Sequence, residues 1–477
     1  MLALHNTLTR RVEPVRPLQA GRVTMYSCGP TVYRPVHVGN LRSFLLSDLI
    51  RRALAWEGIG VHQVMNITDV GHMTDELHDR GEDKMLLAAA DEGLTAGDVA
   101  AKYEAAFHRD LARMGILPAE IYPRASEHLA PMIDLIQRLL DRGHAYVDGG
   151  TVYYDVMSFP GYGALSRNTL EHLRAGHRLD AVDHHKRHPA DFILWKAAGP
   201  RRVVRFDSPW GEGYPGWHIE CSAMSLAYLG ERFDLHTGGV DLTFPHHEDE
   251  IAQSEGALGH PVVTHWVHGD HVLFSGQKMA KSAGNVWTLD TVEDLGAEPL
   301  DFRYLCLTSR YRRQLRFSPD ALLAAARART RLRQSLAGWG EPAAGLGAAA
   351  KEWAGRFREA VLDDLDFPRA LTVVWALAGD EGSAVPAGER AALLHDWDSV
   401  LGLGLGGGGD EPARELPPGA AGRLEARERA RAGRDWATSD RLRDELAALG
   451  VEVADTPEGQ TWRPGSATQG REVVDPG

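Results

Sequence analysis

Apolar residues near the start of the chain predict a strand, a helix and a second strand. Val23 to Tyr26 form a short apolar run that ends at the turn Cys28-Gly29-Pro30. Apolar side chains then recur every three or four residues from Leu41 to Trp56, and Val61 to Thr68 form another apolar stretch. This order favours a parallel sheet whose ligands bind at the carboxyl ends of the strands. We therefore expect an anionic group near Asn40, at the positive end of the helix.

The middle of the chain continues with two helical patterns and then becomes irregular. Residues 98–114 and 129–142 repeat apolar side chains at helical spacing, whereas residues 145–203 resemble short strands and polar loops. We interpret that stretch as an insertion between two halves of the parallel sheet. Its histidine-rich segment, Asp183 to His188, has no thiolates and no regular ligand spacing, so a solvated loop is favoured over a metal site.

The last third of the chain predicts a helical bundle and a tethered small domain. Residues 319–402 are rich in Ala, Leu and Arg with helical spacing, and residues 401–420 are rich in Gly and Pro like a flexible linker. A charged helix is expected from Arg423 through Trp436 to Gly450, followed by a strand over residues 451–453.

Length and composition limit the class of protein. A chain of 477 residues is too long for one hydrophobic core, so two to four domains are expected. No run of eighteen apolar residues and no secretory leader pattern occur, which favours a cytoplasmic protein. Cys28, Cys221 and Cys306 are too few for a disulfide framework, so metal binding or burial is left for each. Cys306 lies in an apolar run, and burial is favoured there.

The net charge of the chain and the charge of one segment point to different partners. The net charge of −14 provides no general attraction to nucleic acid. One segment is nevertheless basic, because its arginines are opposed within it by Asp320 alone. They are Arg310, Arg312, Arg313, Arg316, Arg327, Arg329, Arg331 and Arg333. A solvated helix face and an RNA-contacting face both fit this pattern.

A candidate metal site combines residues that are far apart in the sequence. Cys28 and Cys221 each lie close to a glycine turn, and a lone thiolate rarely binds a metal without other ligands. Pro245 begins a predicted helix on which His246 and Glu250 share one face. Two thiolates, an imidazole and a carboxylate suit tetrahedral Zn²⁺. Without the cysteines, the histidine–carboxylate cluster would be interpreted as a helix cap.

A candidate phosphate site combines the first helix with a later basic loop. Lys278 and Lys281 lie in the stretch Lys278-Met279-Ala280-Lys281-Ser282, and lysines on a loop can neutralise the charge of a triphosphate. His37 and Asn40, beside Gly39 at the predicted helix start, can contact the same phosphates. Either half alone is common in proteins that bind no nucleotide.

These motifs together resemble the cysteinyl-tRNA synthetases, a family of class I aminoacyl-tRNA synthetases, over nearly the whole chain. His37-Val38-Gly39-Asn40 is similar to the HIGH box of the family, and Lys278 to Ser282 is similar to its KMSKS loop. The segments Gly216 to Ser225 and Phe244 to Glu248 also match closely. Residues 437–463 resemble the terminal anticodon-reading domain. Such an order of independent motifs is highly specific.

The resemblance implies a role for each matching residue. The Zn²⁺ ligands would be Cys28, Cys221, His246 and Glu250. Contacts to cysteine would come from Cys28, Gly29, Thr31, Thr68, Trp217 and Asp241. ATP, bound with Mg²⁺, would be contacted by Thr31, His37, Gly39, Asn40 and Lys281, and the catalytic residues would be His37, Asn40, Lys278 and Lys281. For tRNA we expect contacts from Arg312, Arg313, Arg427, Arg434, Trp436 and Asp440.

We expect the chain to act as a monomer. The same resemblance divides it into seven regions. They are a Rossmann-like catalytic domain in two halves (1–125 and 206–270), a connective insertion (126–205), a KMSKS-loop and stem-contact region (271–318), a helical tRNA-binding bundle (319–402), a linker (403–420) and a small α+β anticodon-recognition domain (421–477).

The implied reaction is activation of cysteine by ATP and its transfer to the 3′ end of tRNA. Zinc prefers a thiolate to the hydroxyl of serine far more strongly than an apolar pocket does, so no editing domain is required. Two alternatives are a cysteine ligase with an amino-sugar acceptor and a non-catalytic RNA-binding paralogue. The residues from Arg423 to Arg463 argue against the first, and the intact motifs argue against the second. One departure from the family is the stretch Gly71 to Thr74, where an Asp-Asp-Lys stretch is usual.

Overall fold

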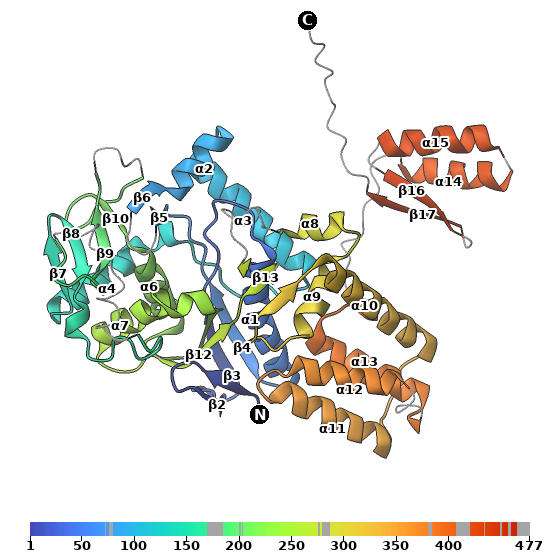
Figure 1. Cartoon of the computed structure of the whole chain (residues 1–477), viewed down its shortest axis with the longest axis horizontal. Helices are drawn as coiled ribbons and strands as arrows, with labels where there is room; N and C mark the ends of the chain where they lie inside the picture. The colour runs from blue at the N-terminus through green and yellow to red at the C-terminus, as the bar shows by residue number, and fades with distance from the viewer. Residues whose placement is uncertain are drawn as a thin grey trace, which may run out of the picture. The chain divides into compact units, whose positions relative to one another are not determined.

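A four-stranded parallel sheet in the order β12-β11-β3-β4 positions the candidate site. Its strands are β3 (Arg22–Ser27), β4 (Gly60–Met65), β11 (Phe233–Gly239) and β12 (Val263–Gly269). Helix α1 (Val38–Trp56) joins β3 to β4 (Figure 1), so the predicted strand–helix–strand unit is confirmed. The carboxyl ends of the strands meet at one edge, where the motifs of the sequence are gathered.

The computed structural model describes most of the chain. The described residues are 1–71, 73–75, 80–168, 185–199, 202, 204–274, 277–278, 287–379, 384–406, 420–433, 435–448, 451–456 and 459–464. The chain divides into two units, Met1–Gly407 and Gly408–Gly477. Among the described residues, no helix is long and apolar enough to cross a membrane.

Both faces of the parallel sheet are buried, as is usual for parallel sheets, although its strands include polar residues such as Asp234 and His236. On β3, Met25 packs into the apolar cluster that contains α1, whereas its neighbour Tyr26 packs into a second cluster. The second cluster contains α6 (Trp217–Leu229) and α7 (His246–Leu258), which contact each other. The sheet is therefore held between α1 on one face and α6 with α7 on the other.

The insertion predicted for residues 126–205 contributes to an antiparallel sheet in the order β10-β9-β8-β7, whose strand β10 lies beyond the predicted end. Its elements are η1 (Ala125–Glu127), α4 (Leu129–Asp141), β7 (Ala145–Asp148), β8 (Thr151–Tyr154), η2 (Val156–Ser158), β9 (Phe192–Ala197) and β10 (Gly213–Pro215). Asp183 and His184 of the histidine-rich segment lie outside the described residues, and His185 is exposed, but the expectation of a solvated loop is wrong for His188. His188 is buried, because its ring accepts a hydrogen bond from the Ala190 amide and its amide donates to Asp191.

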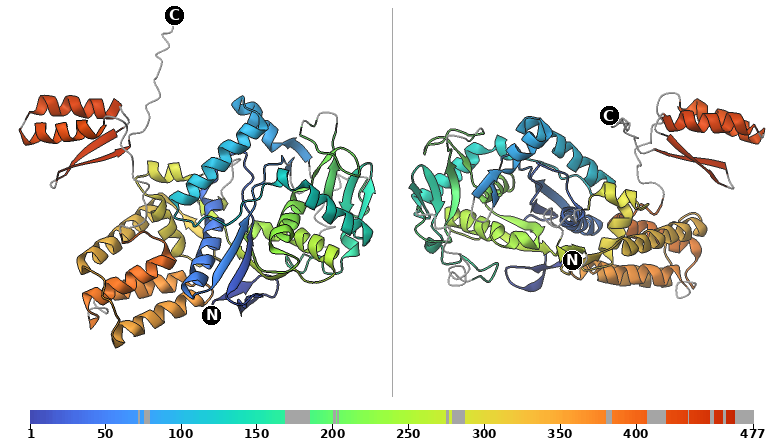
Figure 2. Two further views of the ribbon diagram at one scale, coloured as in Figure 1. Left: turned by 180° about the vertical axis from the view of Figure 1, so that it is seen from behind. Right: turned by 45° about the horizontal axis from the view of Figure 1, so that its top comes forward.

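The predicted helical bundle follows a small three-stranded sheet of order β14-β13-β15. These strands are β13 (Val272–Phe274), β14 (Gln277–Lys278) and β15 (Leu315–Phe317). Helices α8 (Leu289–Asp294) and α9 (Pro299–Leu307) lie between β14 and β15 in the chain. The helices of the predicted bundle, residues 319–402, are α10 (Pro319–Trp339), α11 (Ala348–Leu362), α12 (Phe367–Ala378) and α13 (Ala387–Leu401). The bundle and the insertion flank the parallel sheet on opposite sides in every view (Figures 1 and 2).

The remaining elements of the first unit precede the insertion or follow β11. They are β1 (Ala3–Asn6), β2 (Arg11–Pro14), β5 (Met73–Asp75), β6 (Arg80–Asp83), α2 (Lys84–Glu92), α3 (Ala96–Arg113) and η4 (Val240–Thr243). Of the stretch Gly71 to Thr74, which differs from the family pattern, Met73 and Thr74 lie on β5, and His72 lies outside the described residues. The carbonyl of Gly71 accepts a hydrogen bond from Arg202, which also pairs with Asp83. This stretch is thus tied to the insertion.

Some arginines of the basic segment, residues 310–333, fit neither a solvated face nor an RNA-contacting face, because they pair with acids of the chain itself. Arg312 pairs with Asp364 and Arg310 with Asp366, both at the turn before α12. Arg329 is buried and its side chain bonds Asp301 at 3.1 Å. The prediction considers only acidic residues inside the segment. The partners of these arginines lie outside it in the sequence.

The second unit contains two helices where the sequence predicts one. Helices α14 (Ala420–Ala432) and α15 (Trp436–Ala448) are separated at Gly433, and strands β16 (Val451–Thr456) and β17 (Gly459–Pro464) form an antiparallel pair. The carboxylate of Asp435 accepts the amide of Thr438, which caps the start of α15. A glycine followed by a capping aspartate is what ends one helix and begins the next.

Candidate active site and metal centre

Three elements bring the four predicted metal ligands to the carboxyl edge of the parallel sheet. Cys28 directly follows β3, Cys221 lies in the second turn of α6, and His246 and Glu250 are one turn apart on α7. Their ligand atoms all lie within 4.8 Å of one another. Cys221, His246 and Glu250 are buried, and Cys28 is half-buried. The prediction that these distant residues converge agrees with this geometry.

The distances within this set fit a tetrahedral ion. The two sulfurs of Cys28 and Cys221 are 4.0 Å apart, and His246 Nε2 lies 3.1 Å from Glu250 Oε1. Cys28 Sγ lies 3.9 Å from the same carboxylate oxygen. Zinc bonds of about 2.3 Å to sulfur and about 2.0 Å to nitrogen or oxygen place tetrahedral ligand atoms roughly 3.3–3.8 Å apart. The set therefore needs only small adjustments to hold one ion.

The buried charges of the same residues favour a positive charge among them. His246 Nε2 is buried and has no hydrogen-bond partner among the described residues, although it faces Glu250. Burial opposes protonation of His246, yet the negative charges of Cys221 and Glu250 raise its pKa well above the usual value. Burial also acts against ionisation of Glu250, but His236 and His246 lower its pKa to about 2. A cation at this point would satisfy all of these groups at once.

A chain of hydrogen bonds orients His246 from behind. His246 Nδ1 lies 2.9 Å from His218 Nδ1, and His218 Nε2 lies 3.3 Å from Asp249 Oδ2. The other oxygen of Asp249 accepts the Tyr162 hydroxyl at 2.5 Å. If Asp249 accepts a proton-bearing Nε2 of His218, then His218 Nδ1 accepts from His246 Nδ1. This arrangement leaves the lone pair of His246 Nε2 toward the ligand set, as metal-bound histidines require.

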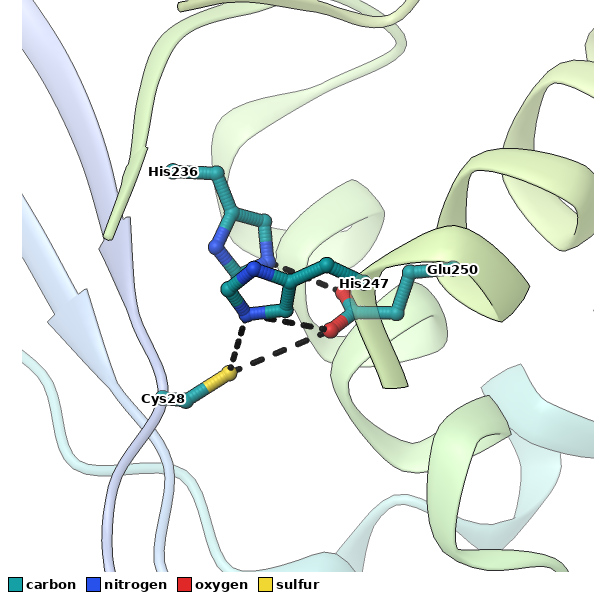
Figure 3. A group of neighbouring side chains, drawn as sticks. All are labelled: Cys28, His236, His247 and Glu250. Atoms are coloured by element: carbon teal, nitrogen blue, oxygen red, sulfur yellow. Dashed lines mark hydrogen bonds and ion pairs between the residues drawn. The ribbon is translucent and has the colours of Figure 1, made fainter. Parts of the chain in front are cut away.

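Two further histidines surround Cys28 and Glu250 (Figure 3). His247 Nε2 lies 3.2 Å from Cys28 Sγ, and His236 Nε2 lies 2.9 Å from Glu250 Oε2. His247 Nδ1 lies 2.7 Å from His268 Nε2. Burial lowers the pKa of His247 and lowers that of His268 to about 3, so both rings are neutral. With Cys28 and Glu250, His236 and His247 form a second group of ligand atoms within 4.8 Å.

The predicted cysteine contacts surround the same edge. Gly29 donates its amide to Asn66 Oδ1, and a Cβ at Gly29 would lie 1.7 Å from the Asn66 carbonyl, so only glycine fits. Thr31 and Thr68 pair as an isolated bridge, and the Thr68 hydroxyl donates to buried Glu220. The Trp217 ring lies 4.5 Å from the His246 ring. The carboxylate of Asp241 lies beside Gly239. A Cβ added at Gly239 would lie 2.5 Å from Asp241 Oδ1 and 3.3 Å from Ser43 Oγ on α1.

The predicted phosphate motif forms the capped start of α1. His37 Nδ1 accepts the Asn40 amide at 3.1 Å, and Asn40 Oδ1 accepts the His37 amide. This bond uses Nδ1 as an acceptor, so a neutral His37 carries its proton on Nε2. A Cβ at Gly39 would lie 2.9 Å from the His37 ring, which explains the glycine. The amides of the first helical turn are a natural site for phosphate.

Comparison with known proteins agrees with these motifs along the whole chain. The model of the tRNA synthetases class I (C) catalytic domain matches residues 14–327, and that of the cysteinyl-tRNA ligase anticodon binding domain matches residues 413–463. The cysteine–tRNA ligases of Thermus thermophilus and Alkalilimnicola ehrlichii are each 44% identical over 97% of this chain, covering 99% and 100% of their own length. The chain belongs to the cysteine–tRNA ligase family. The member from Methanosarcina mazei is 40% identical over 96% of this chain and 98% of its own.

A solved structure of a different synthetase shares the fold of this family member. Methionyl-tRNA synthetase of Mycobacterium tuberculosis, in complex with methionyl-adenylate, has a TM-score of 0.55. It is 16% identical in sequence and covers 80% of this chain and 89% of its own. The α/β class I architecture predicted from the sequence is therefore confirmed.

The structure describes only some of the lysines and tRNA-contacting residues that are expected for a cysteine–tRNA ligase. Lys278 lies on β14, with its Cα paired to that of Leu273, whereas Lys281 and Arg434 lie outside the described residues. Arg313, Trp436 and Asp440 are exposed, and Arg312 is half-buried in its pair with Asp364. Arg427 is 1% exposed, so its side chain lies in the interior of the small domain and not on a surface that could meet RNA.

Sequence reasoning missed four histidines of the family's site. His218, His236, His247 and His268 come from four different elements, α6, β11, α7 and β12, and each lies against a ligand or a neighbour of a ligand. A weak signal exists, because His236 and His268 lie within two strands of a buried parallel sheet, where charged or polar side chains are unusual.

Proposed function

We propose that this chain activates L-cysteine with ATP to form cysteinyl-adenylate and then transfers the cysteinyl group to the 3′ end of tRNA. The observation that carries the proposal is the convergence of Cys28, Cys221, His246 and Glu250 within 4.8 Å. This convergence lies on the same sheet edge as the capped start of α1, so a sulfur-binding group and a phosphate-binding group are neighbours.

Selection of the sulfur is proposed to depend on Zn²⁺ held by these four residues. When bound, the ion supplies a soft Lewis acid that favours a thiolate over a neutral hydroxyl. Around it, Trp217 covers the His246 ring and Gly29 keeps the approach to Cys28 free of a side chain. Serine and cysteine differ too little in size for an apolar pocket to separate them, so the donor set carries the selection.

Adenylate formation is proposed to use the first turn of α1 and the basic loop. The amides at the start of α1 and the Nε2 proton of His37 favour the negative charge of phosphates, which ATP would bring together with Mg²⁺. Lys278 and Lys281 would neutralise the pyrophosphate as it leaves. No side chain here needs to form a covalent bond to the substrate.

Transfer to tRNA is supported by the second unit. The match to the anticodon binding domain, residues 413–463, falls within this unit, which spans Gly408–Gly477. This domain distinguishes the proposal from a cysteine ligase with an amino-sugar acceptor, which would have no use for it. The exposed Trp436, with Arg431 over its ring at 5.7 Å, offers an aromatic surface of the kind that stacks on unpaired bases.

A pyrophosphate-exchange assay across the amino acids tests the proposal, with zinc measured on the same sample and tRNA charging measured beside it. We expect ATP-dependent exchange with cysteine, little exchange with serine, and charging of tRNA with cysteine. Exchange that depends on another amino acid would refute the proposal. Exchange with cysteine but no charging of tRNA would support the amino-sugar alternative instead.

A further inference from the structure

One buried arginine on α1 bonds the turns that precede β13 and β15, the two parallel strands of the small sheet beside the basic loop. Arg42 lies two residues after Asn40 and is 6% exposed. Its Nη1 donates to the carbonyls of Asp270 and His271 at 2.7 and 3.0 Å. Its Nη2 donates to the carbonyls of Arg310 and Arg313 at 3.1 and 2.7 Å. One guanidinium thus joins α1 to two separate turns.

Those two turns begin the small sheet that carries Lys278. Asp270 and His271 precede β13, and Arg310 to Arg313 precede β15, which lies parallel to β13. Backbone bonds from Asp270 to Tyr311 and from Leu315 to His271 fasten the turns to each other. The next strand, β14, contains Lys278 and pairs with β13.

The far side of the basic loop also meets the start of α1. The amide of Val38, in the first turn of α1, donates to the carbonyl of Trp287 at 2.8 Å. Trp287 is the first described residue after Lys281, and its ring packs 5.2 Å from both Phe274 of β13 and Phe317 of β15. The first two turns of α1 therefore hold both flanks of the segment that carries the lysines.

We propose that Arg42 is a positioning residue for adenylate formation, which sets the distance between the His37–Asn40 cap and the strand that carries Lys278. This inference rests on the proposed function. Neutralisation of the negative charge on a leaving pyrophosphate depends on the positions of the cationic groups around it. A misplacement of about 1 Å can cost about 10²-fold in rate. A planar guanidinium can reach four carbonyls in two turns, whereas the compact ammonium of lysine cannot.

The test compares Arg42→Lys with Arg303→Lys in the full chain. Arg303 is a matched control because it is fully buried and bonds the carbonyls of Met114, Gly115 and Leu401. It is also tied to α1, through Asp48 at 2.6 Å, but it contacts neither flank of the basic loop. Both substitutions are therefore expected to lower the melting temperature.

Only Arg42→Lys is expected to lower kcat of cysteine-dependent pyrophosphate exchange, by about 10- to 100-fold, well below the melting temperature of either variant. Its KM for cysteine and its zinc content should remain those of the unsubstituted chain, since the ligand set is untouched. Arg42→Gln, which keeps two amide donors, serves as a second variant if the lysine variant does not fold.

Two results would overturn the inference while leaving the proposed function intact. One is an unchanged kcat in both Arg42 variants, and the other is an equal loss of kcat in Arg303→Lys. A chain that performs no cysteine-dependent exchange before any substitution would instead refute the proposed function itself.

Discussion

Five consecutive side chains at the start of α7, His246 to Glu250, each hold a different part of the site. His247 reaches Cys28, Asp249 reaches Tyr162, and Glu250 reaches His236. Glu248 accepts the backbone amides of residues 163, 165 and 166. Five residues cover more than a full helical turn, so their side chains leave the helix on all sides. All five are buried, which makes this turn the centre of the proposed site.

Replacement of one sulfur tests the ligand set at this scale. Cys221→Ser should lose most of its zinc and its preference for cysteine over serine together, because a hydroxyl is a poor ligand for this ion. Zinc content and pyrophosphate exchange with both amino acids would measure the two effects. Cys306→Ser is the control, since Cys306 is buried in α9 and burial raises its pKa to about 12. Unchanged zinc in Cys221→Ser would refute the site.

The orienting chain behind His246 makes a separate prediction. Asp249→Asn replaces an acceptor of His218 by a group that can also donate, so His246 should lose its fixed tautomer. We expect zinc affinity to fall by about 10- to 100-fold, as is usual when the outer partner of a metal-bound histidine is changed. Competition with a chelator would measure this loss. Tyr162→Phe, which keeps the His218 contact, should show a smaller loss, and equal losses would contradict this role.

The ligands themselves could be predicted from the sequence, but their supporting histidines could not. Cysteine is rare in this chain, so Cys28 and Cys221 become informative when they are combined with His246 and Glu250, which share one face of a predicted helix. Histidine is common, and whether His218 or His236 touches a ligand depends on how α6 and β11 pack. Such contacts become visible only when the elements are placed in space.

At the scale of elements, the turn after β3 depends on a glycine. Gly29→Ala would place Cβ 1.7 Å from the Asn66 carbonyl, which belongs to backbone that cannot rotate away. We expect a loss of stability of at least about 1–3 kcal/mol, together with weaker zinc binding through the displaced Cys28. Thermal or denaturant unfolding and zinc content would measure both.

A glycine in an open helix position provides the comparison. Gly338 lies in α10 with nothing within 4 Å of its Cβ position, so Gly338→Ala should stabilise the chain by about 0.5–1 kcal/mol. Similar stability changes at Gly29 and Gly338 would show that the close approach at Asn66 is not a constraint.

Helix boundaries and ion-pair partners are predicted less well from the sequence than the helices and strands themselves. The charged segment from Arg423 predicts one helix because its composition is helical throughout, yet Gly433 and the Asp435 cap divide it. The arginines from 310 to 333 leave a solvated face and an RNA-contacting face open, because the local sequence does not reveal their pairing with Asp364 and Asp366. Local patterns identify elements well, whereas partners that lie far along the chain remain hidden.

At the scale of the whole molecule, the two units have separate apolar cores. Leu403 and Leu405 pack in the core of the first unit, whereas Leu424 and Leu446 pack in a cluster of the second. A chain that ends at residue 406 should therefore retain the melting transition of the first unit. It should also retain cysteine-dependent pyrophosphate exchange but lose most of its tRNA charging, because the residues matching the anticodon binding domain are removed.

This truncation is measured by exchange and charging assays side by side, at equal concentrations of folded protein. Loss of both activities would contradict an independent first unit. Full charging by the truncated chain would contradict a role for the second unit in binding tRNA.

The central claim is that the ligand set of Cys28, Cys221, His246 and Glu250 recognises the substrate sulfur. The most direct measurement replaces the metal by Co²⁺ and follows its thiolate charge-transfer absorption while cysteine or serine is added to the full chain. We predict that cysteine increases this absorption and that serine leaves it unchanged. Equal spectra with the two amino acids would contradict the claim.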